Sequence, residues 1–175
     1  MPKPSSRRGP AADRPPLDED GLRRLALDYL GRYATTRAKL EAYLFRKLRD
    51  RGGPADAVAR IAQRMAELGY VDDRAFGLQR AGALSRRGYG VRRIATALAV
   101  AGVGREDAAP ALADAAADEW DAALRFARRR RIGPFAAEPL DAAARRRAFA
   151  TLMRAGHSPA IAGRLLAVSG DEFQD

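Results

Sequence analysis

Arginine side chains are the residues of this sequence with the clearest potential for binding chemistry. The chain carries 32 Lys and Arg against 22 Asp and Glu, so its formal net charge at pH 7 is +10. Most of that positive charge is arginine, whose planar guanidinium can donate two parallel hydrogen bonds to a carboxylate or a phosphate. An anionic partner is therefore expected, with nucleic acid or an acidic protein surface ahead of a membrane surface.

The arginines that are candidates for such a surface fall into three groups. They are Arg86, Arg87, Arg92 and Arg93 with Tyr89 between them, then Arg128, Arg129, Arg130 and Arg131, and finally Arg145, Arg146 and Arg147. Neighbouring residues on a helix diverge by about 100°, so a shared basic surface needs side chains from several helices. The alternative, that these arginines only form a solvated surface of a chain rich in Arg and Ala, stays open.

The sequence does not indicate an enzyme. Asp72 and Asp73 stand at an expected helix start, where carboxylates accept backbone N–H groups and stabilise the helix dipole. His157, the only histidine, has no partner at catalytic spacing, and we interpret it as a turn residue. The sequence contains no phosphate loop, metal-ligand set or nucleophile elbow, so we expect no catalytic residue, no metal and no cofactor.

Two helices joined by a short turn must position the first arginine group. Apolar residues at helical spacing end at Gly69, and Asp72 is a good N-cap for a helix that runs to Gly88. After Tyr89, Gly90 begins a further helix. The other expected helices run from Asp18 to about Tyr33, from Thr36 to Gly52, from Pro54 to Leu68, from about Arg105 through Pro110, and around Trp120 to Arg131. A further expected helix holds Arg145 to Arg147 and ends at Gly156, and the last has Ser158 as N-cap and Pro159 at its first position.

A leucine four residues before a helix-ending glycine recurs along the chain. Leu48, Leu98 and Leu152 are the three copies, and they lie 50 and 54 positions apart. Self-similarity at this period indicates stacked units. We therefore predict an all-α fold of three tandem three-helix, helix-turn-helix-like repeats that form an elongated, curved molecule. The predicted segments are a disordered basic tail at 1–16, and repeats at 17–69, 70–117 and 118–175.

The segment GYVDDRAF, followed by RRGYGVRRIATAL, resembles the second helical repeat of the RecX family, regulatory proteins of the RecA recombinase. The matching residues are Gly69, Asp73, Phe76, Gly88, Gly90, Arg93, Ile94 and Leu98, and weaker similarity extends from about Leu25 to Leu166. The resemblance implies the same repeat architecture. It also implies a regulator that binds the RecA nucleoprotein filament in its helical groove and mainly inhibits ATPase, strand exchange and coprotease activities in DNA repair and recombination.

An alternative function comes from the residues themselves. Helix-turn-helix proteins also pair two short helices across a turn, so the chain could be a DNA-binding regulator or a nonspecific nucleic-acid-binding protein. As partners we expect the RecA filament first, and single- or double-stranded DNA second. Without cysteines, an export signal or a run of apolar residues that could span a membrane, the sequence predicts a cytoplasmic protein. We expect a monomer, since there is no heptad pattern.

Overall fold

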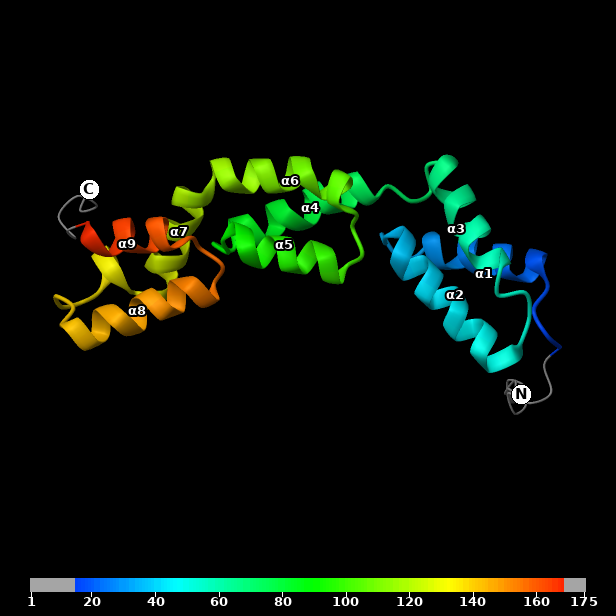
Figure 1. The fold of residues 1–175 in the computed structure, drawn as a ribbon, viewed down its shortest axis with the longest axis horizontal. Coiled ribbons are helices and arrows are strands. Elements are labelled where there is room, and N and C mark those ends of the chain that lie inside the picture. The colour runs from blue at the N-terminus through cyan, green and yellow to red at the C-terminus, as the bar shows by residue number, and fades with distance from the viewer. Residues whose placement is uncertain (1–14, 169–175) are drawn as a thin grey trace, which may run out of the picture. The chain divides into compact units, whose positions relative to one another are not determined.

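The computed structural model describes residues 15–168, and this part of the chain is helical without any strand (Figure 1). The helices are α1 (Glu19–Leu30), α2 (Arg37–Arg51), α3 (Ala57–Glu67), α4 (Asp73–Arg86), α5 (Val91–Val100), α6 (Arg105–Ala117), α7 (Glu119–Arg130), the short 3₁₀ helix η2 (Gly133–Phe135), α8 (Ala142–Arg154) and α9 (Pro159–Ala167). The predicted all-α class is confirmed. Most of the predicted basic tail lies outside the described residues. Among them, no helix combines the length and hydrophobicity that crossing a membrane requires.

The chain divides into two compact units, whose boundary in the sequence lies between Asp72 and Asp73. We refer to residues 15–72 as the N-terminal unit and to residues 73–168 as the C-terminal unit. The N-terminal unit contains α1, α2 and α3, and the C-terminal unit contains α4 to α9. The three repeat boundaries given above stay a prediction.

Leucines on one face of α2 form the centre of the N-terminal unit. Leu40 and Leu44 are fully buried and pack with Leu22 of α1 and Val58 of α3. Local capping fixes where the first two helices begin. The carboxylate of Asp18 accepts the N–H of Gly21 at 2.7 Å, and the hydroxyl of Thr36 accepts the N–H of Lys39 at 3.3 Å. Both predicted N-caps are therefore confirmed.

Two predicted helix limits in the N-terminal unit are wrong. The helix expected from Pro54 begins at Ala57, because the N–H groups of Ala57 and Val58 bond to carbonyls three residues back in a turn. The first helix ends at Leu30 rather than about Tyr33. Its last turn tightens, since two successive N–H groups, those of Arg32 and Tyr33, share the carbonyl of Tyr29 at 3.1 Å.

The C-terminal unit contains two hydrophobic clusters. Ile94 and Leu98 of α5 pack in the first cluster, which α4, α5 and α6 surround. Leu152 and Leu165 are fully buried in the second cluster, between α7, α8 and α9. Tyr89, in the turn between α4 and α5, packs against both clusters. The residue in the middle of the Gly-Tyr-Gly stretch therefore connects the two halves of this unit.

The recurring leucine and glycine end three helices, with a closely similar bonding pattern in the second and third copies and a shorter one in the first. The φ angles of Gly52, Gly102 and Gly156 are 77°, 78° and 94°. Residues that have a Cβ atom rarely adopt such positive φ angles. In each copy the carbonyl of the leucine accepts a capping N–H, from Gly52, Val103 and His157 respectively. The leucine side chains are buried. The spacing thus couples a core side chain to the carbonyl that ends its helix.

Candidate binding site

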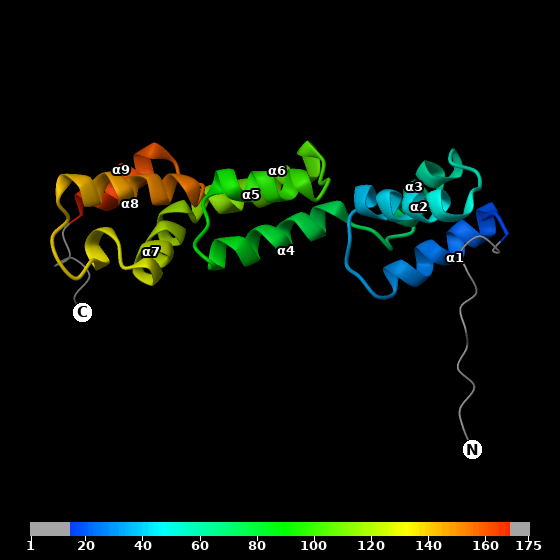
Figure 2. The same cartoon turned by 90° about the horizontal axis from the view of Figure 1, so that it is seen from below.

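The end of α8 meets the start of α5, far away in the sequence (Figure 2). The N–H of Gly90 donates to the carbonyl of Ala155 at 3.0 Å, and the N–H of Arg92 donates to the carbonyl of Gly156 at 3.1 Å. A helix start has unsatisfied N–H groups and a helix end has unsatisfied carbonyls, so each end satisfies the other. We name this contact the α8–α5 joint.

Glycines permit the close approach of the backbones at this joint. A Cβ on Gly90 would lie 2.4 Å from the carbonyl carbon and oxygen of Gly156. A Cβ on Gly156 would lie 2.4 Å from the backbone nitrogen of Arg93, and one on Gly88 would lie 2.7 Å from that of Phe126. The two glycines beside Tyr89 therefore serve the packing of the C-terminal unit.

The buried side chain of His157 forms a further contact at the α8–α5 joint. Its side chain is fully buried, and Nε2 lies 3.1 Å from the carbonyl oxygen of Gly88. Because a carbonyl only accepts, Nε2 carries the proton. The ring also meets Phe126 edge-on, with ring centroids 5.9 Å apart. Burial lowers the pKa of His157 below its ordinary value, against the opposing effects of the hydrogen bond to Gly88 and the charge of Glu119. Its interpretation as a turn residue therefore missed a contact between distant segments.

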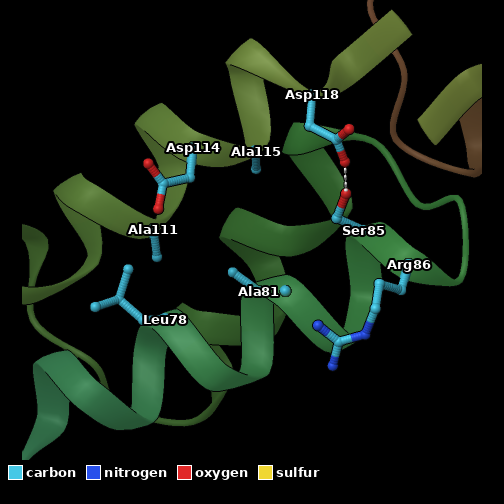
Figure 3. A pocket seen from close by; sticks show the side chains of 9 residues that line it. Leu78, Ala81, Ser85, Arg86, Ala111, Asp114, Ala115 and Asp118 are labelled. Carbon is cyan, nitrogen blue, oxygen red and sulfur yellow. Dashed lines mark hydrogen bonds between the residues drawn. The ribbon is translucent and has the colours of Figure 1, made fainter. Parts of the chain in front are cut away.

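A polar cluster lies where α6 ends and α7 begins. Ser85 at the end of α4 donates its hydroxyl hydrogen to the carboxylate of Asp118 (Figure 3). The same carboxylate pairs with Arg125 of α7. The next residue, Glu119, accepts the N–H of Ser158 at 2.8 Å. A hollow of about 230 Å³ beside Ser85 is lined by residues of α4 and α6, with Arg86 at one side. These bonds hold α4, α7 and α9 around the joint.

Arginines from two of the predicted groups collect around two aromatic rings at the joint. The guanidinium carbons of Arg93 and Arg87 lie 4.5 and 5.5 Å from the ring centroid of Tyr89. Those of Arg129 and Arg130 lie 5.7 and 5.8 Å from the ring centroid of Phe126. The ring centroids of Tyr89 and Phe126 are 6.3 Å apart. We name Arg87, Tyr89, Arg93, Phe126, Arg129 and Arg130 the arginine–aromatic cluster.

The other candidate arginines lie on the same helices or farther along the chain. All eleven candidate arginines are exposed. Arg128 lies over Phe135 at 5.0 Å, and Arg131 ends α7 in the left-handed conformation with a φ of 53°. Arg145 and Arg146 of α8 line a separate hollow of about 450 Å³ with Phe149 and Leu166. Members of the first two groups thus meet at the arginine–aromatic cluster, whereas Arg145 and Arg146 of the third group line a separate hollow.

Phe126 was not among the residues selected from the sequence, although the sequence contains a signal for it. It precedes Arg129 and Arg130 by three and four positions, the spacing at which side chains meet on a helix. An aromatic residue one turn before a basic run is therefore a useful sign that the arginines are held in place.

Comparison with known proteins identifies the family, although no family model matches the chain. The regulatory protein RecX of Myxococcus xanthus is 35% identical, over 94% of this chain and 94% of that protein. The RecX of a Mycobacterium species (strain JLS) is 37% identical, over 93% of this chain and 89% of its own length.

Solved structures agree on the fold. The crystal structure of RecX from Lactobacillus salivarius superposes with a TM-score of 0.67 at 18% identity, over 85% of this chain and 94% of that one. A second crystal structure of regulatory protein RecX gives a TM-score of 0.66 at 20% identity, over 84% of this chain and 70% of that one. The helical repeat fold and the sequence relatives agree, and the chain belongs to the RecX family of regulatory proteins.

Proposed function

We propose that this chain binds the RecA nucleoprotein filament and restrains its activity, with the arginine–aromatic cluster as a main contact. Family membership supports the choice of RecA as the partner. The observation that carries the site is the convergence of Arg87 and Arg93 with Arg129 and Arg130 around two packed rings. A filament of protein on DNA presents both carboxylates and phosphates, the two groups that arginine binds best.

The aromatic rings prepare these arginines for binding. A guanidinium that lies on a ring face keeps its N–H edges available, while the ring limits the rotamers that it samples. Less side-chain entropy is then lost when a partner binds. Tyr89 and Phe126 are themselves fixed by the packing at the α8–α5 joint. The cluster therefore offers four cationic groups with restricted positions.

In the proposed mechanism, the chain lies in the helical groove of the filament and bridges neighbouring RecA subunits. A bound chain would hinder the subunit movements that accompany ATP turnover and would exclude the second DNA of strand exchange. It would also cover the surface needed for coprotease activity and would oppose growth of the filament. Arg86, Arg92, Arg128, Arg131, Arg145, Arg146 and Arg147 are further candidates for contacts with RecA or DNA.

The arrangement of α5 argues against a base-reading helix-turn-helix. A recognition helix reads bases with residues near its N-terminus. Here the first turn of α5 is held against α8 by the carbonyls of Ala155 and Gly156. The hydroxyl of Thr96, one of few polar groups on α5, already donates to the carbonyl of Arg92 at 3.0 Å. Nonspecific binding to nucleic acid is thus the remaining alternative function.

The test is the DNA-dependent ATPase of RecA with increasing amounts of the full chain. The test variant carries Arg87→Ala, Arg93→Ala and Arg129→Ala. The control variant carries Arg23→Ala, Arg60→Ala and Arg64→Ala, which removes the same charge from arginines paired with carboxylates in the N-terminal unit. We expect inhibition by wild type and control, and a concentration for half-inhibition that is about tenfold higher or more for the test variant.

The outcomes separate the function from its site. Equal inhibition by the test variant, with unchanged helicity, would leave the RecA function standing and move the contact to other residues. Absence of inhibition by the wild-type chain at stoichiometric concentration would overturn the proposed function. In that case, binding of the same chain to DNA without RecA, with a steep dependence on salt, would favour the nucleic-acid-binding alternative.

A further inference from the structure

Three tyrosines surround a hollow on the N-terminal unit. None of the eleven candidate arginines lines this hollow. The hollow measures about 440 Å³ and lies between α1 and α2. Its lining consists of Leu25, Asp28, Tyr29, Arg32, Tyr33, Tyr43 and Arg46. We name it the tyrosine pocket. No local sequence pattern predicts this pocket, because Tyr43 joins the other two tyrosines only when α2 folds back along α1.

The three rings of the tyrosine pocket differ in their exposure to solvent. Tyr29 and Tyr43 stack with centroids 4.3 Å apart and an angle of 16° between their planes. Both are half-buried and pack against the core of the unit. Tyr33 lies 5.2 Å from Tyr29 and is 57% exposed. A fixed aromatic pair thus supports a third ring that is open to solvent.

Positive charge surrounds these rings. The cationic groups of Arg46 and Lys47 each lie 5.5 Å from the ring centroid of Tyr43. Arg32 contributes a further guanidinium to the lining, and Asp28 contributes the carboxylate. The pocket therefore combines flat apolar faces with an excess of cations at a distance of a few ångströms.

We infer that the tyrosine pocket binds single-stranded nucleic acid, with a base stacked on Tyr33 and adjacent phosphates on Arg32 and Arg46. Unpaired bases expose flat faces that stack on aromatic side chains, and phosphates on either side of a base match flanking cations. A duplex hides those faces, and an acidic peptide would use the cations but leave the rings unused. The combination of rings and charge therefore favours a single strand.

This inference does not depend on the proposed RecA function. The tyrosine pocket and the arginine–aromatic cluster belong to different units and share no residue. Tests of the pocket use no RecA, so either proposal can fail while the other stands.

The first experiment measures the affinity of the full chain for a labelled oligodeoxythymidine of about 15 nucleotides, by fluorescence anisotropy. Tyr33→Ala removes the exposed ring without opening the core, and Tyr33→Phe retains the ring. Tyr70→Ala is the matched control, because Tyr70 is 58% exposed and does not line the pocket. We expect Tyr33→Ala to weaken binding by about five- to a hundredfold, whereas Tyr33→Phe and Tyr70→Ala bind like wild type.

Salt dependence separates stacking from charge. Tyr33→Ala should weaken binding equally at each salt concentration, since no phosphate contact is lost. Arg32→Ala with Arg46→Ala should instead make the slope of log K against log salt shallower, by roughly 0.7 for each lost contact with a single strand. An oligouridine that follows the same pattern would extend the site to RNA, because stacking does not read the sugar.

Crosslinking locates the base directly, since arginines elsewhere in the chain also attract oligonucleotides. An oligomer with 5-iodouracil is irradiated with the full chain, and the linked peptide is identified. We expect the crosslink at Tyr33, with loss of that product in Tyr33→Ala. Crosslinks only outside residues 25–46, or equal affinities for wild type and Tyr33→Ala, would overturn the inference.

Discussion

His157 shows how a single buried side chain couples folding to pH. Burial lowers the pKa of the His157 imidazole in the folded chain below the ordinary 6.5, so the folded chain binds a proton there less readily. The unfolded chain takes up a proton near that ordinary value. As the pH falls below 6.5, the unfolded chain takes up a proton on His157 more readily than the folded chain does. The free energy of unfolding therefore decreases.

We predict that the C-terminal unit is most stable above about pH 6.5 and loses up to about 1.4 kcal/mol per pH unit below it from this residue. Trp120 is the only tryptophan and belongs to this unit, so its fluorescence can follow thermal unfolding at about pH 7.5 and about pH 5.5.

His157→Gln is the matched variant, because a glutamine Nε2 can also donate to the carbonyl of Gly88 but does not titrate. The variant should lose less stability than wild type between the two pH values. Equal losses in both proteins would show that other groups cause the pH dependence.

Between elements, the α8–α5 joint depends on glycine for space. Gly90 has an ordinary φ of −80°, so an alanine there causes no backbone strain, only a clash with the backbone of Gly156 and His157. We expect Gly90→Ala to destabilise the C-terminal unit by about 2–4 kcal/mol, as overpacking against rigid backbone does. Urea unfolding followed by Trp120 fluorescence measures this.

The control for that variant is Gly163→Ala in α9. Apart from its chain neighbours and the nearby backbone of α9, a Cβ there would meet no heavy atom of residues 15–168 within 4 Å. Alanine in an exposed helix interior should stabilise the unit, by roughly 0.5–1 kcal/mol. If both variants shifted stability in the same direction, the close approach at Gly90 would not be the cause.

The elements also show which features a sequence can reveal. The N-caps Asp18, Thr36 and Ser158 are confirmed, because each cap bonds to an N–H three residues ahead. The start at Pro54 was wrong because proline suits a turn as well as a first helical position. The bond from His157 to Gly88 spans 69 positions, and no local pattern predicts it.

At the scale of the whole chain, the two units have separate cores. Leu44 lies in the core of the N-terminal unit and Leu152 in that of the C-terminal unit, and both are fully buried. Replacing either by alanine should cost its own unit about 2–5 kcal/mol. Leu152→Ala should therefore shift the unfolding transition seen by Trp120, whereas Leu44→Ala should shift only part of the transition seen by circular dichroism.

A shift of the Trp120 transition by Leu44→Ala as large as that by Leu152→Ala would mean that the units unfold together.

The all-α class and the family could be predicted from the sequence, because periodic leucines, helix-ending glycines and one long motif indicate them. The assignment of the candidate arginines to RecA or DNA was not, because each arginine is exposed and its partner belongs to another molecule.

The α8–α5 joint has a mechanical consequence. Hydrogen bonds join the last carbonyls of α8 to the first N–H groups of α5, so the two helices have no slack between them. We therefore expect α5 and α8 to move together when a partner binds to either helix. The arginines of α5 and α8 would then meet a partner at a constant spacing.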